Sequence, residues 1–126
     1  MALEDVFEEL LKEPQKFREW VELQDEDETF CPGDSCGCPL YEFLNQSLHG
    51  KGIRPGYLEV WVDKIGFKEG GSTEDRLREW TFLHWAAIFS HEDEALANDG
   101  IAWIYPKKVL SMLDDIEQSL RPSDNR

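Results

Sequence analysis

Apolar residues recur at three- and four-residue intervals over the first 21 positions, which is the spacing of one helical face. Pro14 interrupts this series, and a proline inside a helix removes a backbone hydrogen bond and clashes with the preceding turn. The pattern therefore predicts two short helices that meet near Pro14, with Pro14 at the first position of the second helix. The apolar positions are Leu3, Val6, Phe7, Leu10, Leu11, Phe17, Trp20 and Val21.

A helix over about 73–90 is predicted to be the central element of the fold. Gly70-Gly71 breaks the chain before it, and Ser72-Thr73-Glu74-Asp75 has the residue types of a capping box. The segment 82–89 is apolar on all sides, as expected for a helix that is buried all round. We expect the other helices to pack around it.

Three further helices follow from the same kind of pattern. One spans 40–48 and is closed by His49-Gly50, because glycine suits the left-handed conformation that ends many helices. A short one follows 91–94 and ends near Asn98. The last begins at Pro106, and its inward-facing residues are predicted to be Val109, Met112, Leu113, Ile116 and Leu120.

Two segments have the alternation of β-strands. In 57–63, Leu58, Val60 and Val62 share one side, and 101–105 is a second short apolar run. The expected fold is a helix-rich α+β single domain over 1–120, with a minor two-stranded sheet from these segments and a frayed tail at 121–126. The first segment also fits helical spacing, which leaves an all-α domain as the alternative.

The net charge of −14 is concentrated in two blocks. Residues 1–30 contribute −8 and residues 57–100 contribute −6, whereas the remaining stretches are neutral. Such a surface repels nucleic acid and anionic lipid and attracts a basic partner; an acidic surface kept for solubility is the simpler explanation. We therefore expect no direct nucleic-acid binding and no membrane association, and the oligomeric state stays open.

The N-terminus lacks the basic and apolar regions of a secretory signal, and no apolar run approaches the roughly 20 residues of a membrane span. An odd number of cysteines is unremarkable in a reducing compartment. These features predict a cytoplasmic protein.

All three cysteines, Cys31, Cys36 and Cys38, lie within eight residues. Thiolates at short spacing in a glycine-containing turn can bind zinc, with His49 as the nearest fourth ligand and His84, His91 and Asp34 as weaker ones. The spacing is not that of common zinc sites, so a thiol–disulfide switch and inert buried thiols remain alternatives. No cofactor is implied beyond this possible zinc ion.

His84 and His91 lie seven residues apart and would share a helix face. A catalytic or metal-binding pair is one interpretation; the simpler one makes His84 a hydrogen-bonded core residue and places His91 at a helix C-terminus. The sequence has no P-loop, no dinucleotide-binding glycine pattern, no His-Glu-x-x-His and no Gly-x-Ser-x-Gly. It therefore predicts no enzyme.

The leading functional hypothesis is a non-catalytic, acidic, cytoplasmic interaction or regulatory protein that binds a basic protein partner. One alternative is a small zinc-binding protein that uses Cys31, Cys36, Cys38 and His49. A second is an inhibitor whose acidic helices mimic nucleic acid on a DNA- or RNA-binding protein.

Overall fold

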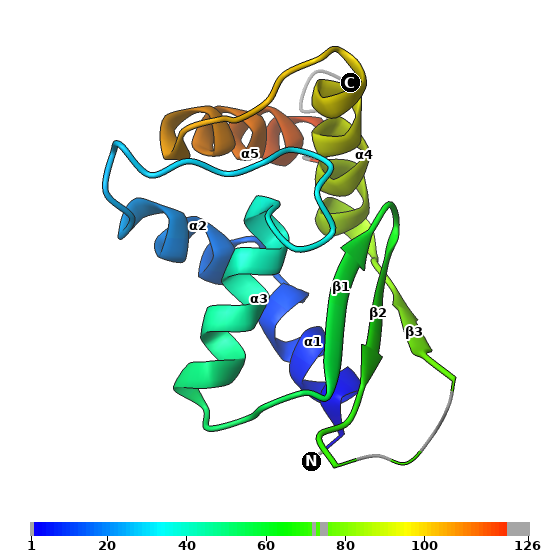
Figure 1. Cartoon of the computed structure of the whole chain (residues 1–126). Coiled ribbons are helices and arrows are strands. Elements are labelled where there is room, and N and C mark those ends of the chain that lie inside the picture. The colour runs from blue at the N-terminus through cyan, green and yellow to red at the C-terminus, as the bar shows by residue number, and fades with distance from the viewer. Residues whose placement is uncertain (1, 72, 74–75, 121–126) are drawn as a thin grey trace, which may run out of the picture.

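The computed structural model describes residues 2–71, 73 and 76–120, and it confirms the predicted helix-rich α+β class (Figure 1). The helices are α1 (Leu3–Leu11), α2 (Gln15–Glu22), α3 (Pro39–Gly50), α4 (His84–Asn98) and α5 (Pro106–Leu120). The strands are β1 (Tyr57–Trp61), β2 (Lys64–Lys68) and β3 (Arg78–Thr81). None of the helices in these residues is long and apolar enough to span a bilayer.

The N-terminal helices are those that the sequence predicts. α1 ends before Pro14, which is the N-cap of α2 rather than its first helical residue. α3 and α5 also form as predicted, and the inward face of α5 is buried except for Leu120, which is 49% exposed. The left-handed residue after α3 is Gly52 rather than Gly50.

The sheet is antiparallel, in the order β1-β2-β3. β1 was predicted, but its partner was not: β2 follows directly, after a turn in which Asp63 has a φ of 71°. The prediction that 101–105 pairs with β1 is wrong. That segment makes a single bridge, between Ile104 and Phe30, while the outer edge of β1 meets the backbone of Ser35 through the Val60 N–H.

The predicted helix over 73–90 is wrong in its first half. Arg78–Thr81 is β3, whose backbone pairs with β2, and the helix begins only at His84. It then continues to Asn98, so the predicted short helix after 91–94 is the second half of α4. Of the proposed capping box only Thr73 is among the described residues, and it lies in no helix. The tail 121–126 also lies outside them.

The core centres on an aromatic cluster comprising Phe17, Trp20, Phe43, Trp85 and Phe89. The ring of Phe17 is fully buried, and its centroid lies 5.3 Å from Phe43, 5.6 Å from Trp85 and 5.3 Å from Phe89. These rings come from α2, α3 and α4, so one side chain joins three helices. Offset and edge-to-face contacts of this kind add to the hydrophobic gain from burial.

Polar contacts connect α1 to residues far along the chain. The indole Nε1 of Trp85 donates a hydrogen bond to the Leu11 carbonyl at 2.8 Å, which satisfies one of the last carbonyls of α1. At the other end of α1, Glu4 forms an ion pair with Arg78 of β3. Figure 1 accordingly shows α1 beside the sheet and the base of α4.

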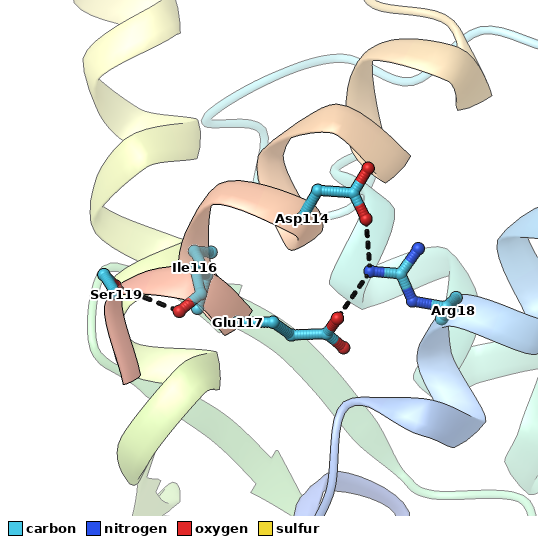
Figure 2. A network of polar contacts seen from close by, with 5 residues as sticks. All are labelled: Arg18, Asp114, Ile116, Glu117 and Ser119. Carbon is cyan, nitrogen blue, oxygen red and sulfur yellow. Dashed lines mark hydrogen bonds and ion pairs between the residues drawn. The ribbon is translucent and has the colours of Figure 1, made fainter. Parts of the chain in front are cut away.

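Arg18 joins α2 to α5. Its Nη2 atom lies 2.8 Å from Asp114 Oδ1 and 2.9 Å from Glu117 Oε2, and its side chain is only 16% exposed (Figure 2). A guanidinium that bridges two carboxylates at this degree of burial holds the helices in register, whereas exposed pairs contribute little.

Arg18→Met should lower the free energy of unfolding by about 1–2 kcal/mol, because two charge-assisted hydrogen bonds are lost while the side-chain volume is kept. Urea denaturation measures this. Lys16→Met is the matched control, because Lys16 pairs with Glu9 at 3.4 Å on the exposed surface. This substitution should lower the free energy of unfolding by less than about 0.5 kcal/mol. Equal costs for the two variants would contradict a special role for Arg18.

Candidate functional site

The segment that holds all three cysteines, residues 31–38, is a compact turn, here called the cysteine loop. The Cys31 N–H donates to the Gly37 carbonyl at 2.9 Å, and the Cys38 N–H donates to the Asp34 carbonyl at 3.1 Å. The Asp34 side chain accepts a hydrogen bond from the Cys36 N–H at 2.8 Å. The loop therefore satisfies most of its backbone groups internally, as an Asx-type turn does.

The cysteine loop is held between the sheet and α4. On one side the Val60 N–H of β1 donates to the Ser35 carbonyl at 2.9 Å. On the other side the Gly33 N–H donates to Asp93 Oδ2 of α4 at 2.7 Å. At Gly33 the backbone has a φ of 71°, and a Cβ there would lie 2.6 Å from the Cβ of Ala97. Only glycine allows this close approach.

A pocket of about 220 Å³ opens to solvent where the loop, β1 and α4 meet. Its wall combines loop residues, the end of β1 and one face of α4. We call it the loop pocket; it is lined by Gly33, Asp34, Ser35, Cys38, Val60, Trp61, Val62, Ser90, Asp93 and Glu94.

Asp93 is the unusual residue of the loop pocket. It is 5% exposed, and its Oδ1 atom has no hydrogen-bond partner among the described residues. Burial raises the pKa of Asp93 to about 6, with a further contribution from the charge of Glu94; the Gly33 N–H acts in the opposite direction. A buried carboxylate with one unpaired oxygen is energetically costly, and such groups are often found at binding sites.

The predicted zinc ligands are only partly brought together. Cys31, Cys36 and Cys38 share the loop, but Cys31 and Cys36 are exposed and Cys38 is buried. His49 lies at the far end of α3, about 16 Å along the helix axis from Cys38 at 1.5 Å per residue. Among the described residues, no group of three or more His, Cys, Asp or Glu side chains is placed to hold a metal ion. The zinc site stays a prediction.

Cys38 has a structural role in this conformation. It is the N-cap of α3, and its sulfur accepts a hydrogen bond from the Tyr41 N–H at 3.4 Å. Burial raises the pKa of the Cys38 thiol to about 12, and the charge of Asp93 adds to this. A thiol with a pKa raised in this way is a poor nucleophile at neutral pH.

The histidines differ from the simpler interpretation of the sequence. His84 is exposed at the start of α4, with a φ of 53°, and lines a groove of about 610 Å³ between α1 and β3. It is not a core residue. His91 lies in the middle of α4, and its Nε2 atom contacts Asp63 Oδ1 in the β1–β2 turn.

A second surface combines acidic and apolar side chains. The acidic linker, residues 25–28, is exposed along its whole length and includes Glu26 and Asp27. These two residues line a shallow hollow of about 650 Å³ together with Tyr105, Lys107, Lys108 and Ser111. Tyr105 belongs to an apolar edge of alternate exposed residues, Ile101, Trp103 and Tyr105, which are 41%, 59% and 48% exposed.

Comparison with known protein families, with curated proteins and with solved structures finds no match to this chain.

Sequence reasoning did not identify Asp93. One pattern could have done so: Trp85, Phe89 and Asp93 follow at four-residue spacing, so Asp93 continues the buried face of α4. An acid in line with two buried aromatic residues is expected to be buried as well. The sequence could not reveal that Gly33 is its partner, because the two are 60 positions apart.

Gly33→Ala should lower the free energy of unfolding by about 2 kcal/mol or more, because it adds a steric clash to the cost of a left-handed conformation. Thermal denaturation measures this. Gly52→Ala is the matched control: its φ is 75° but no atom lies within 4 Å of the added carbon, so about 1 kcal/mol is expected. Similar losses in both variants would show that the close approach to α4 contributes nothing.

The raised pKa of Asp93 predicts the direction in which stability changes with pH. The folded protein holds the Asp93 proton up to about pH 6, whereas the ordinary value is 3.8. The contribution of Asp93 to the free energy of unfolding is therefore largest below about pH 4. It decreases as the pH rises to about 6 and stays lower above that pH. Asp93→Asn removes the ionisation, so relative to wild type it should gain about 2 kcal/mol between pH 4 and pH 7.5.

Urea denaturation of the Asp93→Asn variant and wild type at both pH values measures this gain. Asp99→Asn, at the exposed end of the same helix, should behave like wild type at both. A difference between Asp93→Asn and wild type that is independent of pH would contradict the assignment.

Proposed function

We propose that this protein is a non-catalytic cytoplasmic interaction protein that binds a basic protein partner through the acidic linker and the apolar edge. The observation that carries the proposal is the hollow in which Glu26 and Asp27, the middle pair of an exposed run of four acids, lie together with Tyr105. Charge attracts and orients a partner, while large apolar side chains supply binding energy once water is excluded.

The distribution of basic side chains supports the proposal. Among the described residues, Lys16, Arg18, Lys51, Lys64 and Arg78 form ion pairs with acids elsewhere in the fold. No ion pair within the described part of the chain involves residues 25–28. Lys107 and Lys108 line the same hollow as Glu26 and Asp27 but form no ion pair with them, so the linker carboxylates stay available to an external group.

The apolar edge indicates what else the partner must offer. Trp103 is 59% exposed, and tryptophan is the residue type most often found at the energetic centre of interfaces. Ile104, between the exposed residues, is anchored by its bridge to Phe30, so the edge is held in an extended conformation. The partner would present an apolar hollow beside a basic patch, and Lys107 and Lys108 across the hollow would restrict its orientation.

The cytoplasmic location is part of the proposal. Three cysteines are free and two of them are exposed, which fits a compartment that keeps thiols reduced. The sequence contains none of the catalytic motifs considered above, which supports a role in binding rather than catalysis.

The experiment starts with cross-linking of the whole chain in extract, followed by binding measurements with each purified candidate partner. Neutralisation of the acidic linker (Asp25→Asn, Glu26→Gln, Asp27→Asn and Glu28→Gln together) should weaken binding about tenfold at low salt and flatten its salt dependence. Neutralisation of Asp5, Glu8, Glu13 and Glu22, which are exposed acids of α1, α2 and the turn between them, should have a much smaller effect.

Trp103→Ala should weaken the same interaction about 30-fold, because an exposed tryptophan at an interface centre contributes about 2 kcal/mol. It should leave the melting temperature unchanged. Leu83→Ala is the control, since Leu83 is 57% exposed but lines the different groove beside His84. Affinity that does not respond to salt, to the linker variant or to Trp103→Ala would contradict the proposal.

A further inference from the structure

We propose that the loop pocket binds the head of an organic cation that carries N–H donors, namely a primary ammonium group. The pocket belongs to neither the acidic linker nor the apolar edge. Only the attribution of this ammonium group to a lysine of the partner rests on the proposed function.

The polar groups of the loop pocket favour a cationic donor. Asp34, Asp93 and Glu94 line it, and no lysine, arginine or histidine does. Asp93 is only 5% exposed, and its Oδ1 atom lacks a hydrogen-bond donor within the described chain. Less than 1 Å² of Oδ1 is accessible. An ammonium in the pocket would therefore supply the donor after a rotation of the Asp93 carboxylate toward the pocket, and it would bring the opposite charge that a buried carboxylate requires.

Several other polar groups of the pocket are already engaged, which directs a ligand toward Asp93 and Glu94. Asp34 Oδ1 accepts from the Cys36 N–H, and Ser90 Oγ accepts from the Asp63 N–H at 3.2 Å and donates to the Trp61 carbonyl at 3.3 Å. Gly33 N–H is occupied by Asp93 Oδ2. The carboxylates of Asp93 and Glu94, which are neighbours in α4, are therefore available for a ligand, and Asp93 Oδ1 is the buried oxygen without a donor.

A metal ion fits this arrangement less well than an ammonium group. Within the described ranges, no three His, Cys, Asp or Glu side chains converge as metal ligands. An ammonium needs fewer acceptors, at hydrogen-bond distances, and brings its own apolar stem. Val60 and Val62 supply apolar wall for that stem. A volume of about 220 Å³ equals roughly seven water molecules, enough for a butylammonium ion.

The test is an NMR titration of the whole ¹⁵N-labelled chain with n-butylammonium chloride at pH 7.5 and constant ionic strength. The backbone amide signals of Gly33, Ser35 and Glu94 should shift saturably. Tetramethylammonium, which has the charge but no N–H donor, should bind at least tenfold more weakly. Equal responses to both cations, or shifts that do not saturate, would overturn the inference.

Variants connect the titration to the carboxylate. Asp93→Asn should weaken butylammonium binding at least tenfold, and Asp99→Asn, the matched loss of one charge on the same helix, should not change it. If Asp93→Asn loses the dispersed spectrum of a folded protein, Glu94→Gln takes its place and should weaken binding at least threefold. Wild-type affinity in whichever of the two variants folds would overturn the inference.

The source of the ammonium group is decided by a second ligand, the blocked peptide acetyl-Gly-Lys-Gly-amide. Binding at least as tight as that of butylammonium supports entry of a lysine side chain from a partner; binding of butylammonium alone supports a free small amine. Because the titrations contain no partner protein, their failure would leave the role of the acidic linker intact. If the linker variants bind the partner as wild type does, the inference about the loop pocket likewise stands.

Discussion

The burial of Phe17 is the constraint on which the rest of the structure depends. Its ring contacts Phe43 of α3 and both Trp85 and Phe89 of α4, so the helix that carries it cannot move without disturbing two others. Arg18, the next residue, pairs with Asp114 and Glu117 of α5. One turn of α2 is therefore joined to every later helix, to α3 and α4 by apolar contacts and to α5 by ion pairs.

The loop pocket follows from this arrangement. The aromatic cluster fixes α4 through Trp85 and Phe89, and Asp93 lies one helical turn beyond Phe89 on the same buried face. The cysteine loop then closes over Asp93 because it must reach both β1 and α4 within eight residues. Packing thus gives a reason for two residues of that loop, since Gly33 allows the close approach to α4 and Cys38 caps α3.

The sequence predicted the elements whose apolar spacing is long and regular, such as α1, α2 and α5. It failed at 78–81, where four residues are too few for their period to be read and where pairing with β2 decides the conformation. Ile101–Tyr105 shows the opposite error: a strand-like sequence makes only one bridge, with Phe30, and the outer edge of β1 meets Ser35 instead. Local pattern determines helices, whereas strands also need a partner.

The same limit applies to the candidate sites. The cysteines and the acidic linker were visible as sequence clusters, but Asp93 became notable only through its burial and through Gly33. An unpaired oxygen is a property of three-dimensional packing. Exposure of Trp103 is likewise visible only in the folded chain, since its apolar neighbours in sequence suggested a buried strand.

The contacts of α1 also bear on the order in which the molecule can form. Leu11 is joined to Trp85, and Glu4 to Arg78, each across 74 positions of the chain. During synthesis from the N-terminus, α1 emerges long before the residues that cover its apolar face. Phe7, one of its five buried side chains, packs on Phe67 of β2 and Trp80 of β3, so the first helix to be made gains these contacts only after the sheet has been synthesised.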